Sequence, residues 1–348
     1  MDENTKNKSI QISKVFLNNL DREYHNINHS AEVAERALSI AKEESVSVNE
    51  RRLIEIASWY HDIGYIFGPE DHEDVSSRIA SQVLNSLNVP DIEIKRVVNA
   101  IKTTKVPQEY SEDIVSQIIG DADLVSLGLT YDKFYKQRMK VFHEFTHEMT
   151  PKEWAENMGI KLLETQSYMT KTAKERYSEQ LDRNIERHRQ FIEDGSPEVL
   201  VGGTFDIIHA GHKELLETAF GYGTPTIGLT SDELANNSRE RQVKPYNERY
   251  DRLRSEAEKL SEFYCREFNI VKLKTKKDIS TSKEADIIVI SPEPKTKKRV
   301  ESINKTRVEK GLNKLEVIVS DEVYAYDGNR ISSTRIRNNE ICRDGSKK

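Results

Sequence analysis

The sequence predicts two domains of different class, an all-α domain followed by an α/β domain built on a Rossmann-like parallel sheet. From about Ile10 to about Ile192, apolar residues recur at spacings of three and four, which is typical of helices packed against one another. After Pro197 the chain alternates short apolar runs with helical patterns, as parallel strands joined by helical crossovers require. We therefore place the helical domain at residues 1–193 and the α/β domain at residues 197–348.

Size and composition agree with this division. A length of 348 residues suits two domains, and a hydrophobic content of 36% is enough for two packed cores. The net charge of −6 argues against non-specific binding to nucleic acid. No apolar run approaches the roughly 18–20 residues that span a bilayer.

The N-terminus and the cysteines indicate the cellular compartment of the protein. The first ten residues are polar and lack the apolar core of a signal peptide. The two cysteines, Cys265 and Cys342, offer neither a disulfide framework nor a zinc motif. We expect a cytoplasmic protein without membrane or nucleic-acid partners, and the sequence is compatible with an oligomer.

Two boundaries inside the helical domain can be predicted. An apolar helical pattern leads into residues 61–62, and we expect Gly64 to end that helix. Residues 170–194 form one long helical pattern rich in charge pairs four apart, with Gly195 as its stop signal.

The α/β domain begins with a strand at 199–201 that runs into glycines. Later apolar runs predict further strands, and the patterns between them predict helices. The predicted strands are 199–201, 285–291 and 314–321, and the predicted helices include 213–220, 246–260 and 296–311.

The segment after the first strand carries the strongest functional signal. Gly203 lets the backbone turn tightly close to a ligand, and a helix opens at His209-x-Gly211-His212. The first turn of a helix offers free N–H groups and positive potential, which suit phosphate. The two histidines are three residues apart, so both rings can face one side of that turn and donate to phosphoryl oxygens.

A second signal lies near the end of the chain, at residues 330–337. Ser332, Ser333 and Thr334 supply three hydroxyls, and Arg335 and Arg337 follow them. Guanidinium groups suit bidentate phosphate contacts. We therefore expect a second helix N-terminus directed at phosphates.

These motifs, GTFD-x-x-H-x-G-H and ISSTRIR, resemble the HxGH nucleotidyltransferase superfamily, and within it the archaeal and eukaryotic form of phosphopantetheine adenylyltransferase. The resemblance covers residues 198–341. It continues through residues 226–234, 243–249, 288–293, 303–307 and 310–321.

The resemblance implies an α/β nucleotidyltransferase that transfers AMP from ATP to 4′-phosphopantetheine, giving dephospho-CoA and pyrophosphate. No covalent intermediate is expected, because the acceptor phosphate attacks the α-phosphorus directly and the protein positions and stabilises charge. Mg²⁺ is implied as the ion that bridges the phosphate oxygens of ATP.

The resemblance also implies roles for individual residues. His209 and His212 would contact the triphosphate and stabilise the transition state, and Thr204 and Asp206 would lie at the reacting centre. The β- and γ-phosphates would be held by Ser332, Ser333, Thr334 and Arg335. Further nucleotide- or substrate-binding positions would be Gly203, Phe205, Gly211, Lys244, Arg249 and Arg307, although a surface role explains each of the last three equally well.

The helical domain carries imidazoles and carboxylates in an ordered pattern. His25 and His29 are four residues apart and would share one helix face, His61-Asp62 follows an apolar helix, and Asp123 comes later. Such side chains suit a divalent transition metal (Mn, Fe, Co, Ni or Zn), which makes hydroxide available near neutral pH.

Other acidic and histidine residues nearby are less informative. We expect Asp121 to serve a turn or a cap. His143 and His147 fit an exposed helix face.

This pattern resembles the HD phosphohydrolase superfamily, over roughly residues 10–190. The resemblance implies metal-dependent hydrolysis of a phosphorylated small molecule. The metal ligands would be His29, His61, Asp62 and Asp123. His25 would act as general acid toward the leaving group, and His72 would bind a second metal or the substrate phosphate.

Two alternatives remain open from the sequence. The same HxGH machinery serves cytidylyl transfer to an alcohol phosphate and adenylyl transfer to nicotinamide mononucleotide. The helical domain could also be a regulatory module that binds a nucleotide or a CoA-related metabolite. The substrate of the helical domain and the reason for the fusion are not given by the sequence.

Overall fold

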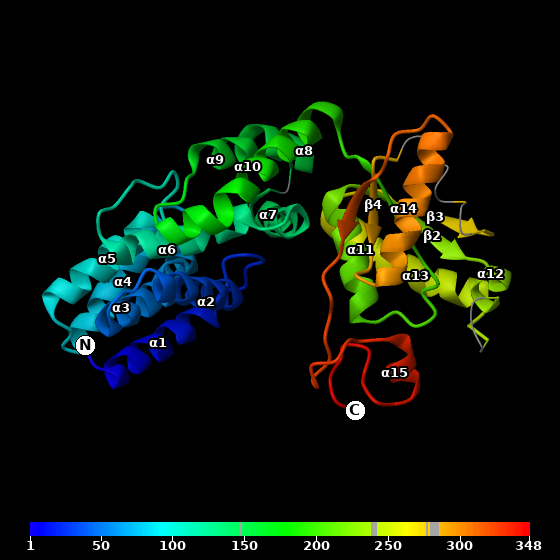
Figure 1. Ribbon diagram of the computed structural model, residues 1–348. Coiled ribbons are helices and arrows are strands. Elements are labelled where there is room, and N and C mark those ends of the chain that lie inside the picture. Colours follow the sequence, from blue (N-terminus) through cyan, green and yellow to red (C-terminus); the bar gives the residue numbers. More distant parts are fainter. Residues whose placement is uncertain (147, 238–241, 276–277, 279–284) are drawn as a thin grey trace. The chain divides into compact units, whose positions relative to one another are not determined.

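The chain folds into two compact units, drawn in Figure 1 in the computed structural model. We call Met1–Thr130 with Gln137–Ile192 the helical unit, and Tyr131–Lys136 with Glu193–Lys348 the sheet unit. The structure describes residues 1–146, 148–237, 242–275, 278 and 285–348. The predicted fold class, a helical domain followed by an α/β domain, is confirmed.

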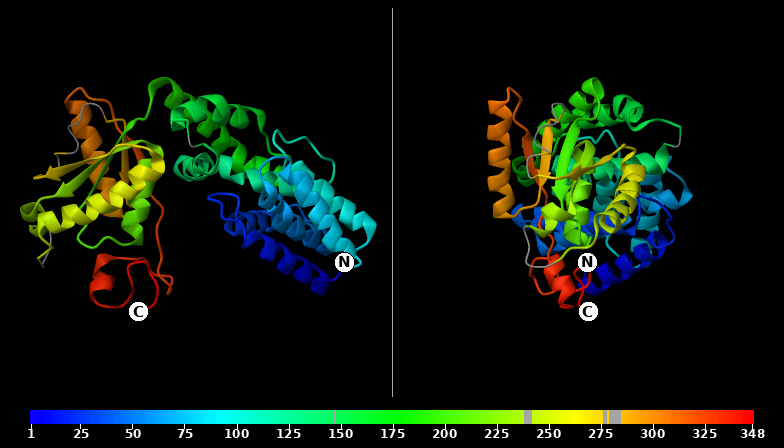
Figure 2. Two further views of the ribbon diagram at one scale, coloured as in Figure 1. Left: turned by 180° about the vertical axis from the view of Figure 1, so that it is seen from behind. Right: turned by 90° about the vertical axis from the view of Figure 1, so that its right-hand side faces the viewer.

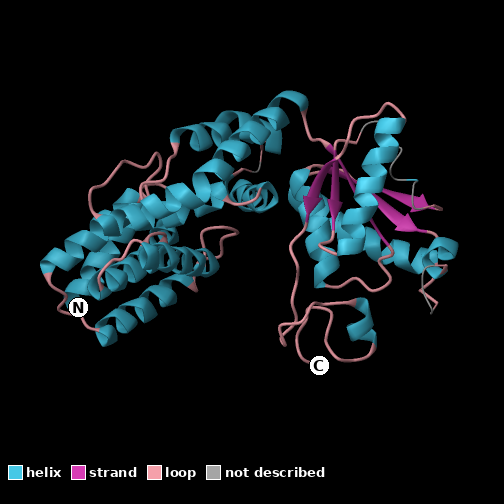
Figure 3. Ribbon diagram, viewed as in Figure 1, coloured by secondary structure: helices cyan, strands magenta, loops and turns pink. Residues whose placement is uncertain are grey.

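Helices make up the regular structure described in the first unit (Figure 3). The α-helices through its length are α1 (Glu3–Leu17), α2 (Ile27–Glu43), α3 (Val48–Tyr60), α4 (His72–Ser86), α5 (Asp91–Thr103), α6 (Ile114–Leu124), α7 (Tyr131–Phe145), α8 (Pro151–Trp154), α9 (Ile160–Thr165) and α10 (Lys171–Asp194). Short turns of other helix types are η1 (Ile63–Phe67), η2 (Val125–Gly128) and η3 (Ala155–Gly159).

The long helix predicted at residues 170–194 is confirmed as α10. Gly195 follows it with φ of 87°, a left-handed conformation that suits glycine and ends the helix. Asp121 holds the turn that leads into it: Oδ1 accepts from the backbone N–H of Met169 at 2.7 Å, and Oδ2 from that of Thr170 at 2.7 Å. The cap itself is Thr170, whose Oγ1 accepts from the N–H of Ala173 at 3.1 Å. Asp121 therefore serves a turn, which is one of the two roles expected for it.

The sheet unit holds five parallel strands in the order β3-β2-β1-β4-β5. The strands are β1 (Glu198–Gly203), β2 (Thr224–Thr230), β3 (Asn269–Leu273), β4 (Ile287–Ile290) and β5 (Glu316–Val319). The helices are α11 (Ala210–Tyr222), α12 (Asp232–Asn236), α13 (Tyr246–Tyr264), α14 (Pro294–Glu309) and α15 (Ser333–Arg337). Strands β2 and β3 lie on one side of β1, and β4 and β5 lie on the other.

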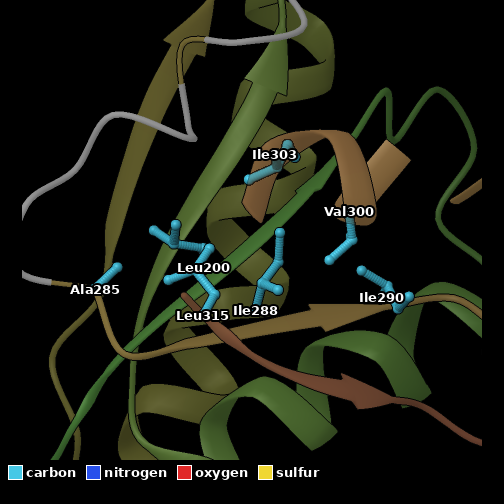
Figure 4. Packing of buried hydrophobic residues seen from close by; sticks show 7 residues of the cluster. All are labelled: Leu200, Ala285, Ile288, Ile290, Val300, Ile303 and Leu315. Carbon is cyan, nitrogen blue, oxygen red and sulfur yellow. The ribbon is translucent and has the colours of Figure 1, made fainter. Parts of the chain in front are cut away.

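Helices cover both faces of this sheet. Figure 2 shows α14 on one face and α11 with α13 on the other. On the α14 face, Leu200 of β1 pairs in register with Ile288 of β4. Figure 4 shows how these side chains pack against Val300 and Ile303 of α14. Burial on both faces explains why all four residues of β4 are apolar and buried.

The first turns of α7 belong to the sheet unit, although their sequence lies within the range expected for the helical domain. Lys136 donates to the carboxylate of Glu217 on α11 at 2.6 Å. A Cβ at Gly221 would lie 2.8 Å from Cα of Asp132, so a glycine is needed where this segment meets α11. Among the described residues, no helix combines the length and apolarity needed to cross a bilayer.

Removing the Asp121 carboxylate should destabilise the helical unit. Asp121→Ala leaves the buried N–H groups of Met169 and Thr170 without their acceptor, at an expected loss of about 1–3 kcal/mol in the free energy of unfolding. Urea unfolding followed by circular dichroism measures this loss. Asp182→Ala, at an exposed position of α10, is the control and should change stability little. Equal stability of the two variants would contradict the role of Asp121 in this turn.

Candidate functional sites

A cavity of about 480 Å³ opens at the carboxyl ends of the strands in the sheet unit. Its walls include Gly203 at the end of β1, Thr230 of β2, Leu273 of β3, Ile290 of β4 and Ser320 after β5. Parallel strands end at the same edge of a sheet, and the strand order reverses beside β1. Ligands of open α/β sheets bind in this crevice.

His209 and His212 lie side by side in this cavity. His209 is the N-cap residue of α11, and the two rings stack with centroids 4.0 Å apart. Nδ1 of His212 donates to the carbonyl oxygen of Ile207 at 2.9 Å, which leaves Nε2 as its second polar atom. A Cβ at Gly211 would lie 3.3 Å from the His209 ring, so glycine leaves room for it.

His209 is held neutral by its surroundings. Burial lowers the pKa of its imidazole to about 3, and the nearby charges of His212 and Arg330 act in the same direction. The ring is 7% exposed, so its free surface faces the cavity.

The start of α11 is tied to the end of the chain. The N–H of Ala210 donates to the carbonyl oxygen of Arg343 at 2.9 Å. Ala210 also packs against a small core formed by Ala325, Ile331 and Ile341. One of the N–H groups expected to be free for phosphate is therefore already used, and this contact fixes the tail beside α11.

The predicted hydroxyl cluster lies in the same cavity as the histidines. Ser332, Ser333 and Thr334 all line it, and Ser332 caps α15 by accepting from the N–H of Arg335 at 3.3 Å. Thr204 lines it too, with Oγ1 3.3 Å from Oγ1 of Thr230. The two motifs, more than a hundred residues apart in sequence, thus share one cavity.

Phe205 and Gly203 shape the turn after β1 in different ways. Gly203 lines the cavity, whereas Phe205 is buried at 1% exposure and packs behind His212 with centroids 5.2 Å apart. Phe205 has a φ of 48°, and a Cβ at Gly203 would lie 2.9 Å from its ring. Phe205 therefore supports the histidine from behind rather than lining the ligand space.

Asp206 and Lys244 lie outside the cavity lining. Asp206 is 2% exposed, its Oδ1 accepts from the N–H of Lys244 at 2.9 Å, and its Oδ2 pairs with Arg337. The ammonium of Lys244 pairs with Glu248 at 2.6 Å. Asp206 thus connects the turn after β1 to α15 and to the segment before α13.

The three arginines that were predicted to bind nucleotide or substrate make hydrogen bonds and ion pairs within the protein instead. Arg249 is fully buried and donates to the carbonyl oxygens of Lys244 and Thr204 at 2.8 and 2.9 Å. Arg307 is 1% exposed and donates to the carbonyl oxygen of Ala285, before β4 and so at the opposite edge of the sheet. The guanidinium of Arg335 closes its own loop, with contacts to Asp327, Asn329, Arg330 and Glu340.

Two arginines that the sequence reasoning did not assign line the cavity instead. Arg330 lies between the carboxylates of Glu293 and Glu322, at 3.3 Å from each. Arg299 lines the cavity from α14. No pattern in the sequence marked Arg299, which is exposed beside the buried Val300.

In the helical unit, four predicted ligand atoms converge. Nε2 of His29 lies 3.2 Å from Oδ1 of Asp123 and 3.4 Å from Oδ2 of Asp62. Nε2 of His61 lies 3.0 Å from the same Asp62 oxygen and 3.3 Å from Nε2 of His29. His29 starts α2, where the Asn26 side chain caps the helix, while His61 and Asp62 follow α3 and Asp123 ends α6.

These atoms fit a divalent cation. Nδ1 of His61 donates to the carbonyl oxygen of Ser58 at 2.8 Å, so Nε2 is the nitrogen directed at the cluster. Oδ2 of Asp62 is buried, and the Nε2 atoms of His29 and His61 approach it without forming a hydrogen bond of good geometry among the described residues. A buried carboxylate oxygen without a donor is costly unless a cation balances it.

The charges in this cluster depend on one another. Burial alone would raise the pKa of Asp62, but the charge of His61 holds it well below its usual range. Burial would likewise raise the pKa of Asp123, which the hydrogen bonds to His29 and His61 lower. Burial lowers the pKa of His29. Both carboxylates and the His29 ring are therefore in the forms that bind metal. Burial would lower the pKa of His61, but the charge of Asp62, together with Asp123, raises it well above its usual value, so a metal would displace a proton from this ring.

His72 stands beside this cluster. Its Nδ1 donates to the carbonyl oxygen of Pro69 at 3.0 Å, and its Nε2 lies 3.6 Å from Oδ1 of Asp62. Gly64 does not end α3, as the sequence suggested, because α3 ends at Tyr60 and Gly64 lies inside η1. A Cβ at Gly64 would lie 2.0 Å from the His72 carbonyl oxygen, so glycine allows α4 to approach.

His25 is not helical, so the expected shared helix face with His29 is wrong. Asn26 is the N-cap of α2, and His25 precedes it. The His25 ring nevertheless lies near the ligands, 5.9 Å from the His29 ring between centroids. His143 near the end of α7 is partly buried, and His147 lies outside the described residues.

The partner of His25 was missed by the sequence reasoning. Nδ1 of His25 lies 2.7 Å from Oε1 of Glu144. Burial alone would raise the pKa of Glu144, but the hydrogen bond and charge of His25, with two backbone N–H groups, lower it to about 2. Nothing in the spacing of these residues indicated the pair, because they are 119 positions apart.

Comparisons with known proteins match a different family to each of the two units. The Cytidylyltransferase-like family matches residues 200–339, and the HD domain family matches residues 26–127. The phosphopantetheine adenylyltransferase of Methanosarcina acetivorans is 39% identical over 155 residues, which cover 44% of this chain and 96% of that relative. The chain belongs to the phosphopantetheine adenylyltransferase family. It is a nucleotidyltransferase whose helical unit carries an HD domain, as the motifs predicted.

Other similarities concern parts of larger or different proteins. A bifunctional phosphopantetheine adenylyltransferase/NTP phosphatase of Thermoplasma volcanium is 39% identical over 148 residues, covering 42% of this chain and 43% of that relative. A crystal structure of Bacillus subtilis YpgQ in complex with ADP is 18% identical, with a TM-score of 0.40, and covers 55% of this chain and 95% of that chain.

The buried neutral His209 should make the sheet unit sensitive to acid. An unfolded histidine takes up a proton below about pH 6.5, whereas folded His209 stays neutral down to about pH 3. Acidification through this window favours the unfolded state, so stability is lost as the pH falls.

His209→Asn should remove this loss. The free energy of unfolding of the variant, relative to the unsubstituted protein, should rise by up to about 1.4 kcal/mol per pH unit below pH 6.5. Urea unfolding at pH 7.5, 5.5 and 4.5 measures the difference. A difference that does not change with pH would show that His209 is not held neutral.

Proposed function

We propose that the sheet unit transfers AMP from ATP to 4′-phosphopantetheine, releasing pyrophosphate and forming dephospho-CoA. The observation that carries this proposal is the shared cavity, which His209 and His212 line together with Ser332, Ser333 and Thr334. An oxygen of the acceptor phosphate forms a bond to the α-phosphorus, and the bond from that phosphorus to the bridging oxygen of pyrophosphate breaks. Family membership supports the choice of acceptor.

The two histidines have different tasks in this reaction. Nδ1 of His212 is committed to the carbonyl of Ile207, so a donor contact from Nε2 to phosphate requires the protonated ring. His209 is buried and neutral, and it serves as a hydrogen-bond donor without adding a second charge. Donors fixed before the reaction stabilise the charge that develops on the transferred phosphorus.

The remaining groups hold the leaving pyrophosphate. Ser332, Ser333 and Thr334 at the start of α15 bind the β- and γ-phosphates, and Thr204 faces the reacting phosphorus. Arg299 and Arg330 supply the positive charge that the buried Arg249 and Arg307 cannot bring to the cavity. Mg²⁺ would accompany ATP and would neutralise part of the charge on its phosphates.

We propose that the HD domain hydrolyses a phosphate ester of a small molecule with a divalent transition metal. His29, His61, Asp62 and Asp123 would hold the metal, which supplies a hydroxide nucleophile near neutral pH. The convergence of their ligand atoms, with the orphaned Asp62 oxygen among them, supports this proposal. His72 faces Asp62 from the far side and would bind the substrate phosphate or a second metal.

Acceptor choice and the histidines can be tested together. With purified full chain, pyrophosphate release should require ATP and 4′-phosphopantetheine, and CTP, nicotinamide mononucleotide or glycerol phosphate should not replace them. His209→Asn and His212→Asn should each lower kcat on the order of 10²–10³-fold, with smaller changes in KM, because their contacts strengthen in the transition state.

His143→Asn, a histidine of the helical unit, is the matched control and should retain full transferase activity. Faster turnover with another nucleotide or acceptor would contradict the proposed substrates. The proposal of nucleotidyl transfer would still stand. Normal kcat in both variants would overturn the roles of the two histidines.

The metal centre can be tested by removing its ligands. The purified chain should contain a transition metal, and His61→Asn and Asp123→Asn should lose it, because each removes one of few ligands. A chelator should stop hydrolysis of p-nitrophenyl phosphate, and adding Mn²⁺, Co²⁺ or Ni²⁺ should restore it. Elemental analysis and the p-nitrophenol assay measure both effects.

Asp182→Asn, at an exposed position of α10, controls for the loss of a carboxylate and should keep its metal. Absence of metal and of hydrolysis in the unsubstituted chain would remove the hydrolase proposal and leave the transferase proposal untouched.

A further inference from the structure

A buried carboxylate from α7 holds the loop that carries His25. The side chain of Glu144 is 3% exposed, and its two oxygens are used differently. Oε2 accepts from the backbone N–H groups of Tyr24 at 2.8 Å and His25 at 3.0 Å. Oε1 lies 2.7 Å from Nδ1 of His25 and accepts from Arg22 at 3.2 Å. Anchoring the loop needs only one oxygen, and the other is directed at the imidazole.

This contact fixes which nitrogen of His25 carries a proton. A carboxylate flanked by an arginine and two N–H groups accepts hydrogen bonds, so Nδ1 of His25 must be the N–H donor. Nε2 is then the nitrogen left to meet a substrate. The carboxylate also stabilises the positive charge that the ring carries when it acts as a proton donor.

The plane of the ring is fixed by a second contact. Tyr65 of η1 stacks on His25 with centroids 4.1 Å apart and planes 22° apart. Arg22 secures this stack, because it donates to the carbonyl oxygen of Tyr65 at 3.3 Å and lies over the Tyr65 ring. Hydrogen bond and stacking together leave the His25 ring one orientation.

In that orientation the ring borders the metal cluster without joining it. Its centroid lies 5.9 Å from that of His29 and 6.3 Å from that of His72. Within the described residues, the group close enough to share an ion is His29, His61 and Asp123. His25 therefore lies beside the predicted metal ligands rather than among them, where it would meet a bound substrate.

We propose that Glu144 is a positioning residue for His25, fixing its tautomer and orientation so that Nε2 delivers a proton to the leaving group. The proposal rests on the proposed hydrolase function of the HD domain. A hydroxide oxygen forms a bond to phosphorus, the bond from phosphorus to the leaving oxygen breaks, and the Nε2 proton moves to that oxygen. The ring then regains a proton from water, while Nδ1 keeps its hydrogen bond to Glu144 throughout.

The first test uses leaving groups of different basicity. A general acid matters most when the leaving oxygen is strongly basic, so Glu144→Gln should slow hydrolysis of phenyl phosphate about 10²-fold or more. Hydrolysis of p-nitrophenyl phosphate, whose leaving group needs no proton, should slow less than about 10-fold. His25→Asn should show the same selectivity, because both changes remove the same proton delivery.

The control is Glu44→Gln, another carboxylate that accepts from a backbone N–H, that of Thr172 at 2.7 Å, without contacting a histidine. It should slow neither substrate. An equal loss on both substrates in Glu144→Gln would show a purely structural role and overturn the proposal. Absence of hydrolysis in the unsubstituted chain would instead count against the hydrolase function itself.

A second measurement does not depend on catalytic activity. Nitrogen-15 NMR of the unsubstituted chain, with the His25 signal assigned by its loss in His25→Asn, reports which ring nitrogen is protonated. A proton on Nδ1 with a strong hydrogen-bond shift is expected. A ring protonated only on Nε2 would overturn the proposal, because Glu144 could not then hold it as described.

Discussion

The common direction of the five strands is the constraint on which the sheet unit depends. Because all five are parallel, their carboxyl ends meet at one edge, and every loop that leaves this edge can reach the same crevice. Gly203 and Ser320 enter the cavity from strands far apart in sequence. The tail reaches the same place because Arg343 binds the start of α11. Position at this edge, rather than residue type alone, decides which groups can touch a phosphate.

The helical unit buries two carboxylates and two imidazoles in one place. Buried charges are costly unless they are balanced, and here each carboxylate lies within 3.6 Å of an imidazole nitrogen. The balance is incomplete at Oδ2 of Asp62, which has no hydrogen-bond partner among the described residues. A cation at the point where His29, His61 and Asp123 converge would complete it. The same low polarity that makes this cluster costly makes a bound ion effective.

The sequence predicted what is locally encoded and missed what depends on tertiary packing. Continuous apolar runs and stop signals gave β1, β4, β5 and α10, and short motifs gave the histidines and hydroxyl groups that line the cavity. Strands β2 and β3 were not assigned, because TPTIGLT is interrupted by proline and glycine and NIVKL is a half-exposed edge strand. Glu144 was missed because its partner lies 119 residues away, a distance that periodicity cannot bridge.

Arginine shows why residue type alone does not reveal a ligand. Arg249 was a reasonable phosphate contact by sequence, but it donates to two carbonyl oxygens and a carboxylate and is fully buried, so a ligand would have to break a satisfied network. Arg330 lies on the cavity surface between two carboxylates and its side chain is 36% exposed. Solvent screening makes such pairs weak, so phosphate can replace either carboxylate at little cost. The carboxylates of Glu293 and Glu322 therefore keep Arg330 extended beside the cavity until an anion takes their place.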